Sequence, residues 1–140
     1  MVTPDERMEI ETMMNALFAR RDSGKGHLMS ELFTEDALLE TTFARLEGRE
    51  AIHAFFSNAA HGGTGPIRHF WSNLTLEAQP DGTVKAHSYG LTVGDVNGEV
   101  VVMAGDMRDV LVREPDGWKF RERIVTHAIR GGFQGNSTGA

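Results

Sequence analysis

Cysteine is absent from this sequence of 140 residues, so the chain has no disulfide, no thiolate nucleophile and no cysteine–zinc site. The amino terminus lacks the basic start and apolar core of a signal peptide, and no apolar run approaches the ~20 residues of a membrane helix. Lysine and arginine total 14 against 20 acidic residues, so no cationic stripe suits nucleic acid. These absences predict a cytoplasmic protein that binds neither nucleic acid nor membrane.

What is present is the composition of an ordinary globular domain. Hydrophobic residues make up 40% of the chain and charged residues 24%. A chain of this length is typical of a single domain that buries roughly 68% of its unfolded surface. We expect one domain over residues 1–130 and a glycine-rich polar tail over residues 131–140 that is disordered.

A strong helix signal opens the chain. Thr3 can cap the helix, Pro4 suits its first turn, and Glu6 completes a capping box. Apolar residues then recur on one face at helical spacing, namely Ile10, Met13, Met14, Leu17 and Phe18. A Ser-Gly-Lys-Gly stop signal follows, so the helix should end near residues 20–22.

The rest of the chain divides into a mixed region and a strand-rich region. The mixed region predicts a short helix at 28–33, short strands at 37–41 and 43–46, and a helix at 50–59 with Phe55 inward. From Pro66 onward, four long segments rich in β-branched and aromatic residues are separated by Pro-Asp-Gly and Asn-Gly turns. These segments predict strands over residues 67–78, 83–94, 99–113 and 118–130.

Helices followed by a strand meander indicate an α+β fold. Glycines within the predicted strands, Gly90, Gly94 and Gly105, are points where a sheet can bend strongly. We predict a strongly curved antiparallel sheet wrapped around the long amino-terminal helix, forming a cone-shaped α+β barrel with an internal pocket. Methionine and aromatic side chains would give that pocket an adaptable lining for a small apolar molecule.

This order of elements carries a family resemblance. The long helix is followed by LFTEDALLE (32–40), RHFWSNLTLE (68–77) and GDMRDVLVREPDGWKFRERIV (105–125). Over residues 5–130 the chain resembles the nuclear-transport-factor-2-like superfamily. It is most similar to the SnoaL-like branch of polyketide cyclases, scytalone dehydratase, hexachlorocyclohexane dehydrochlorinase and ketosteroid isomerase. The resemblance implies the cone fold and a dimer or trimer, but the same fold hosts isomerases, dehydratases and binding modules.

The resemblance also implies a catalytic set. The dehydratase and the dehydrochlorinase place an aspartate at the end of the first helix and a histidine at the start of the strand after the third helix. Asp22 and His69 match these positions, and Arg123 matches a pocket arginine of the dehydrochlorinase. The chain departs from the pattern at Leu17, where the dehydrochlorinase has a lysine, and at Arg21, where the dehydratase has a tyrosine. Despite these departures, the resemblance still implies the same class of chemistry, but it does not imply the same substrates.

Strict alternation divides the strand at 67–78 between two faces. His69, Trp71 and Asn73 share one face, and an ordinary buried face suits Phe70, Leu74 and Leu76. If Asp22 accepts the Nδ1 proton of His69, the pair becomes an oriented base whose Nε2 faces the pocket. The residues expected to contact substrate are Leu17, Trp71, Asn73, Tyr89 and Phe55. The alternatives are a packing role for His69 and a capping role for Asp22.

Arg123 has two interpretations. On a solvated face it pairs with acids such as Asp106 or Asp109 across the sheet, and in a pocket it stabilises an enolate oxygen or a departing group. The remaining histidines lack the spacing of a metal site, so we expect no metal. They are His27, His53, His61, His87 and His127.

Together these patterns predict a lyase or isomerase of the dehydratase, dehydrohalogenase or cyclase type that needs no cofactor. His69 would remove a proton from a small apolar cyclic or polyketide-like substrate, oriented by Asp22, with Arg123 stabilising the charge that develops. The main alternative is a non-catalytic module that binds a small hydrophobic ligand. A third is a structural homodimer or homotrimer, joined through an outer sheet face that includes Val101 and Met103.

Overall fold

The computed structural model describes residues 1–58 and 65–134. The first part contains α1 (Pro4–Asp22), the 3-10 helix η1 (Gly26–Leu32), β1 (Phe33–Glu40), β2 (Arg45–Glu47) and α2 (Arg49–Ser57). The second part contains four long strands, β3 (Ile67–Ala78), β4 (Val84–Val96), β5 (Glu99–Glu114) and β6 (Gly117–Gln134).

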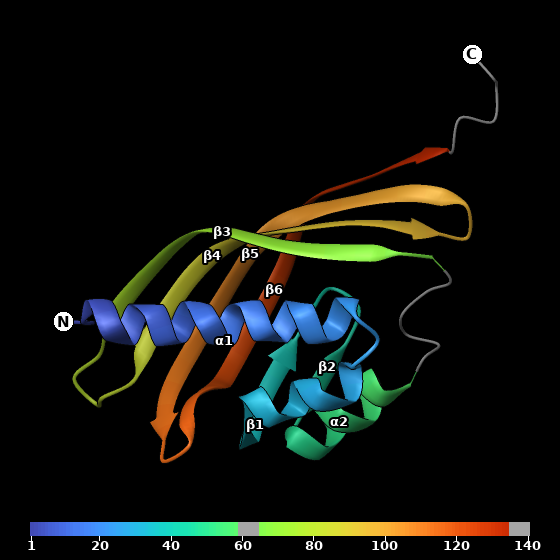
Figure 1. Cartoon of the computed structure of the whole chain (residues 1–140). Coiled ribbons are helices and arrows are strands. Elements are labelled where there is room, and N and C mark those ends of the chain that lie inside the picture. The colour runs from blue at the N-terminus through green and yellow to red at the C-terminus, as the bar shows by residue number, and fades with distance from the viewer. Residues whose placement is uncertain (59–64, 135–140) are drawn as a thin grey trace.

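The strands form one sheet in the order β2-β1-β6-β5-β4-β3. This sheet curves around α1, which lies on its concave side (Figure 1). The predicted α+β fold with a curved sheet around the first helix is confirmed. Two details differ from an antiparallel barrel, because the sheet is open and β1 pairs with β6 in parallel.

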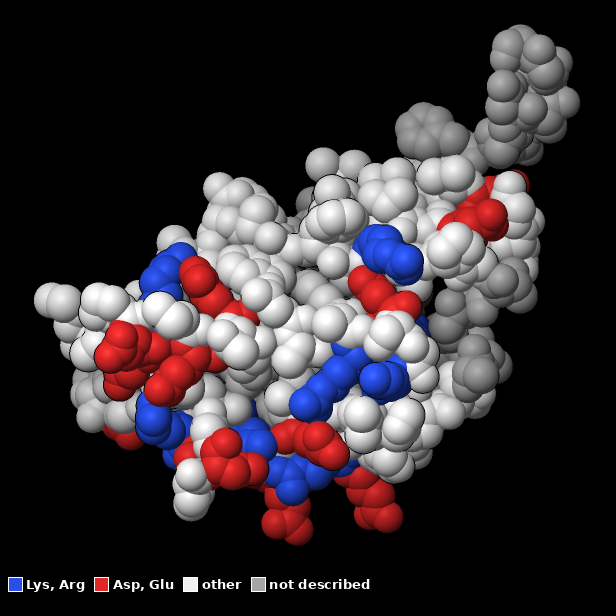
Figure 2. Space-filling view, viewed as in Figure 1, with Lys and Arg blue, Asp and Glu red and all other residues white. Residues whose placement is uncertain are grey.

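α1 forms as its cap and apolar stripe predict. The Thr3 hydroxyl accepts the backbone N–H of Glu6 at 3.2 Å, and the Glu6 carboxylate accepts that of Thr3 at 2.8 Å. The four buried residues of the stripe each contribute about 1.5–3 kcal/mol; they are Ile10, Met13, Met14 and Leu17. Charged side chains gather over α1 and η1 in the lower half of Figure 2, as expected for the solvated side of the helix.

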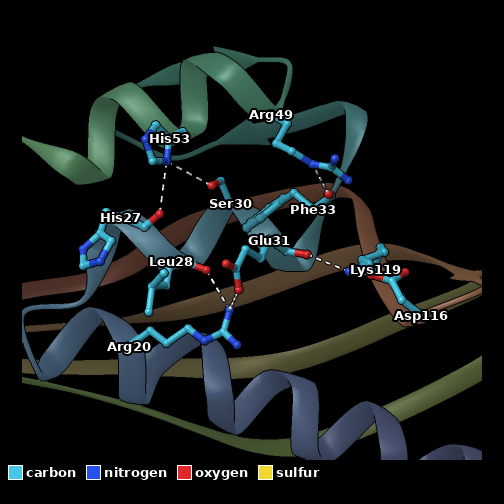
Figure 3. A network of polar contacts seen from close by, with 10 residues as sticks. All are labelled: Arg20, His27, Leu28, Ser30, Glu31, Phe33, Arg49, His53, Asp116 and Lys119. Atoms are coloured by element: carbon cyan, nitrogen blue, oxygen red, sulfur yellow. Dashed lines mark hydrogen bonds and ion pairs between the residues drawn. The ribbon is translucent and has the colours of Figure 1, made fainter.

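η1 holds the carboxyl end of α1 in place (Figure 3). Arg20 donates to the carbonyl oxygen of Leu28 at 2.7 Å and to the carboxylate of Glu31 at 3.2 Å. Lys119 of β6 donates to the carbonyl oxygen of Glu31 at 2.7 Å. These bonds connect α1, η1 and β6 next to Asp22, which is the last residue of α1.

A bulge in β3 interrupts the predicted alternation. Asn73 has φ of 56°, in the left-handed region that asparagine tolerates better than most residues. The register between β3 and β4 shifts between Ser72 and Thr75. Because one residue is added to the strand, the side chains beyond the bulge change faces.

The prediction of two separate faces in β3 is therefore wrong. His69 and Trp71 lie on the same concave side as Leu74 and Leu76, which pack in or against the core. Phe70 lies on the outer side and is 52% exposed.

Apolar side chains cross the outer side of the sheet in one row. Paired positions on β3, β4, β5 and β6 make up this outer row, which is Phe70, Leu91, Ala104 and Ile129. Val101 and Met103 were predicted for the outer side and lie on the concave side instead. The register explains the correction, because Met103 pairs with Thr92, the partner of His69.

β6 is longer than predicted. Residues 131–134 were expected to begin a disordered tail, but they pair with residues 99–102 of β5. β5 extends to Glu99 and offers its backbone N–H and C=O groups to a neighbour, which residues 131–134 supply. Residues 135–140 lie outside the described residues, as does Ala59, the predicted last residue of α2.

Candidate active site

The end of α1 and the start of β3 bring Asp22 and His69 together. The Nδ1 of His69 lies 2.6 Å from Oδ1 of Asp22, and the backbone N–H of His69 donates to Oδ2 of Asp22 at 2.9 Å. Both carboxylate oxygens therefore bind one residue, which fixes the position and the rotation of the imidazole. Because a carboxylate only accepts, the ring proton sits on Nδ1 and Nε2 carries a lone pair.

The surroundings of the Asp22–His69 pair shield most of it from water. The two side chains are 14% and 19% exposed, and the Phe18 ring stacks on the imidazole at 5.3 Å. Burial lowers the pKa of His69, and the positive charge of Arg21 adds to this, while the hydrogen bond and charge of Asp22 oppose it. The pKa is lowered overall, so His69 is neutral at neutral pH, as a proton-abstracting base must be.

Arg123 lies deeper than the pair and is not a free cation. Its Nε and Nη2 donate to the two carboxylate oxygens of Asp109 at 2.7 and 2.9 Å, and the side chains are 3% and 0% exposed. Asp109 was one of the two partners predicted for Arg123 across the sheet. The prediction that this pair lies on a solvated face was wrong, because both side chains are buried. The guanidinium lies 5.7 Å from the centroid of the Phe18 ring, and the same ring stacks on His69, so Phe18 connects Arg123 to the pair.

Three of the residues predicted to contact substrate have packing or hydrogen-bonding contacts within the protein. Trp71 is half-buried, and its Nε1 donates to Oδ1 of Asn15 on α1 at 2.8 Å. Leu17 is 2% exposed and belongs to the closed core. Phe55 is half-buried on α2 and meets Phe56 edge-on at 5.1 Å.

Asn73 and Tyr89 do not face the space beside His69, contrary to the prediction. Asn73 is the exposed bulge residue of β3. Tyr89 pairs with Ser72 on the outer side of the sheet, where it is 50% exposed and meets His87 edge-on at 5.8 Å. The bulge and the β3–β4 register account for both corrections.

A hollow of about 280 Å³ adjoins the carboxylate side of the pair. It lies between the end of α1, the end of α2 and the start of β3, and its lining includes Arg21, Asp22, Phe56 and Ile67. His69 does not line it. The apolar ligand cavity expected around Nε2 of His69 stays a prediction.

His127 belongs to the concave side, although its sequence spacing had set it aside. It pairs with Gly105, and its Nδ1 lies 2.9 Å from Oγ1 of Thr42. Alternation along the last strand is the signal that could have found it, because residues 123, 125 and 127 share one face.

Other histidines have structural contacts. The Nδ1 of His53 lies 3.0 Å from the carbonyl oxygen of His27 and 3.2 Å from Oγ of Ser30, which ties α2 to η1 (Figure 3). His61 lies outside the described residues. Within residues 1–58 and 65–134, no group of three or more His, Asp or Glu residues is placed to hold a metal ion. No helix in these ranges combines the length and hydropathy of a membrane span.

A long helix on the concave side of an open, curved sheet is the cone fold that the similar solved structures share. The chain belongs to the SnoaL-like domain family, which matches residues 3–124. The resemblance predicted from the sequence is confirmed.

Several solved structures share this fold. A provisional scytalone dehydratase from Novosphingobium aromaticivorans matches with a TM-score of 0.80 and 20% identity, over 92% of this chain and 91% of that chain. A Catenulispora acidiphila protein in complex with S-DNPA matches with a TM-score of 0.77 and 26% identity, over 89% of this chain and 95% of that chain. A type 2 hexachlorocyclohexane dehydrochlorinase matches with a TM-score of 0.82 and 17% identity, over 92% of this chain and 89% of that chain. No curated protein sequence matches the chain.

Proposed function

We propose that the protein is a lyase or isomerase that needs no cofactor and uses His69 as its general base. The Nε2 of His69 would remove a proton from a carbon next to a carbonyl or a leaving group. Asp22 would hold the Nδ1 proton and stabilise the imidazolium that forms. The observation that carries the proposal is the double contact of Asp22 with His69, at 2.6 Å to the ring and 2.9 Å to the backbone.

The substrate class is a small apolar molecule, cyclic or polyketide-like. Support comes from two aromatic side chains: Phe18 stacks on the His69 ring, and Trp71 lies two residues further along the same face of β3. The similar structures include a provisional dehydratase and a dehydrochlorinase, both of which are named for elimination reactions.

We assign Arg123 a positioning role in place of direct charge stabilisation. Its charge is balanced by Asp109, and it supports Phe18, on which His69 stacks. Loss of Arg123 would then act on catalysis through the orientation of His69.

Deuterium exchange into a cyclic ketone tests proton abstraction without the natural substrate. β-Tetralone and related ketones are incubated with the protein in deuterium oxide, and loss of the α-proton signal is followed by NMR. We expect the wild-type protein to accelerate exchange and His69→Ala to reduce the rate by about 10²–10⁴-fold. His87→Ala is the matched control, because it removes a histidine paired with Asp106 on the outer side; its rate should stay within about twofold of wild type.

Two results would speak against this chemistry. Equal exchange rates in the wild type and His69→Ala would remove the base from the mechanism. Binding of the ketones without exchange, unchanged in Asp22→Asn, would favour the non-catalytic ligand-binding module.

We also propose that the protein forms a homodimer or homotrimer through the outer row. Phe70, Leu91 and Ile129 are 52%, 39% and 65% exposed there, and a contiguous exposed apolar patch marks an interaction surface. Sedimentation of the wild type as an oligomer, with dissociation in Ile129→Lys, is the expected result. A wild-type monomer at micromolar concentration would reject it. The cytoplasmic location stays a prediction.

A further inference from the structure

The hollow of about 280 Å³ lies where the carboxyl ends of α1 and α2 meet the start of β3 (Figure 1). On one side of it, a Cβ at Gly26 would lie 2.5 Å from the carbonyl oxygen of Phe56, so η1 and α2 meet through their backbones. On another side, a Cβ at Gly65 would lie 2.6 Å from the carbonyl oxygen of Asp95. The backbone N–H of Asp95 also donates to the carbonyl oxygen of Pro66 at 2.9 Å. Closely packed backbone therefore bounds the hollow and fixes its shape.

Arg21 brings a positive charge to this hollow. Among the described residues that line it, Arg21 is the one lysine or arginine. Its guanidinium lies 5.4 Å from the centroid of the Phe56 ring, a cation–π contact that places it along the side formed by α2. Burial lowers the pKa of Arg21, and the charge of Asp22 opposes this. A guanidinium stays charged at neutral pH, so Arg21 carries a partly dehydrated charge that an anionic ligand would stabilise.

The negative groups around the hollow limit that ligand to a single charge. Asp22 also lines the hollow, and both of its carboxylate oxygens accept hydrogen bonds from His69. α1 ends at Asp22, and the last carbonyl groups of a helix carry a partial negative charge. Both would repel a dianion such as phosphate. A carboxylate has one charge and matches the planar fork of a guanidinium, so it is the anion that suits this site.

Apolar side chains give the ligand its second requirement. Phe56 of α2 lines the hollow together with Pro66 and Ile67 at the start of β3. Such a lining favours a ligand with an aromatic or hydrocarbon body next to its charged group. The volume is at the small end of the roughly 300–1,000 Å³ typical of small-molecule sites, so the hollow suits a small acid or one end of a larger one.

We propose that this hollow binds the carboxylate end of an apolar or aromatic acid and that Arg21 selects for the charge. Because Asp22 lines the hollow and binds His69, a ligand there lies against the carboxylate of the Asp22–His69 pair. The acid is then one end of the substrate, which is a cyclic ketone that also carries a carboxylate. This last step rests on the proposed role of His69, whereas the binding site itself does not.

Calorimetric titration with 2-naphthoate and its uncharged analogue 2-naphthamide tests the selection for charge. We expect the wild-type protein to bind the naphthoate at least about tenfold more tightly than the amide, and Arg21→Gln to bind the two equally. Arg113→Gln is the matched control and should keep the preference. Arg113 also lies over an aromatic ring, at 5.6 Å from the centroid of Trp118, but it does not line the hollow.

Glycine amide signals in proton–nitrogen NMR spectra report where the naphthoate binds. The signals of Gly24 and Gly65, which line the hollow, should shift as 2-naphthoate is added. Those of Gly82 and Gly117, which lie in turns and do not line the hollow, should stay in place. Phosphate and acetate at the same concentrations should shift Gly24 and Gly65 much less, because neither combines a single charge with an apolar body.

Three results would overturn the site. Equal affinity of the wild type for 2-naphthoate and 2-naphthamide would remove the selection for charge, and this comparison needs no variant. Unchanged signals of Gly24 and Gly65 at saturating naphthoate would place binding elsewhere. Phosphate binding as tightly as naphthoate would show a general anion site in place of one for apolar acids.

Deuterium exchange tests the link to the substrate. A β-tetralone with a carboxylate on its aromatic ring should show a KM at least about tenfold lower than the corresponding amide, and Arg21→Gln should remove this difference. Equal KM values in the wild type would overturn the acid as part of the substrate. Naphthoate binding without exchange of any ketone would leave the site standing and remove the base. Exchange that depends on His69, without selective binding of naphthoate, would leave the base standing and overturn the site.

Discussion

Two histidine–aspartate pairs with the same separation lie on opposite sides of one sheet. On the concave side, Nδ1 of His69 lies 2.6 Å from Asp22; on the outer side, Nε2 of His87 lies 2.6 Å from Asp106. The inner side chains are 19% and 14% exposed and the outer ones 32% and 32%. Distance alone therefore does not separate a candidate base from a surface ion pair.

The surroundings make the difference. Asp22 comes from the end of a helix and binds both the ring and the backbone of His69, whereas Asp106 is on the strand next to His87 and binds its ring. Phe18 stacks on His69, while His87 has the exposed Tyr89 edge-on beside it. A shielded ring held at Nδ1 keeps its lone pair on Nε2, and the proposed role of His69 as a base rests on this difference between the two pairs.

The largest expected difference between the two sides is in stability. Asp109→Ala leaves the Arg123 charge buried without a partner and should lower the free energy of unfolding by about 3–5 kcal/mol. Asp106→Ala removes a half-exposed partner and should cost at most about 1 kcal/mol. Urea denaturation of both variants measures the difference, and similar losses would refute the distinction between a buried and a solvated side.

Substitutions at the β3 bulge, which puts His69 and Leu74 on the same side of the sheet, should change the free energy of unfolding by a smaller amount. Asn73→Val places a β-branched residue at positive φ and should cost about 1–2 kcal/mol. Asn73→Gly should cost less, because glycine adopts this conformation freely. Urea denaturation checks both, and equal stability of the two variants would argue against a strained position at residue 73.

pH dependence compares the sites in a single assay. Burial lowers the pKa of His69 in the folded protein, so the exchange rate should be constant at high pH and fall up to about tenfold per pH unit below a midpoint under 6.5. His87→Ala should leave this midpoint in place. Stability should also fall as the pH drops from 6.5 toward the lowered pKa, because the unfolded chain binds the proton first. A midpoint above 6.5 would contradict a base kept neutral by burial.

Local signals were sufficient for the first helix, and the family resemblance singled out the pair at its end. The capping box and the stop signal predicted a helix that ends near residues 20–22, and the resemblance pointed to Asp22 and His69. Arg123 shows the limit of alternation, which suggested Asp106 or Asp109 as its partner but could not say which. The β5–β6 register decides for Asp109 and buries it.

The missed features depend on long-range pairing. Nothing near Asn73 in the sequence marks it as a bulge residue, because asparagine is equally common in turns. A single bulge nevertheless moves every later side chain of the strand to the opposite face of the sheet. The ring of His127 contacts Thr42, which is far away in the sequence. The parallel β1–β6 pairing makes this contact possible because it brings the β1–β2 connection beside β6. Contacts of this kind are set by tertiary packing and leave no local pattern.

The most direct test is the position of the ring proton on His69. Long-range proton–nitrogen correlation NMR of isotopically labelled protein at neutral pH distinguishes the two neutral forms of each histidine. We expect His69 to carry its proton on Nδ1, with Nε2 bare, and His87 to show the reverse arrangement. A proton on Nε2 of His69, with Nδ1 bare, would contradict its role as the base.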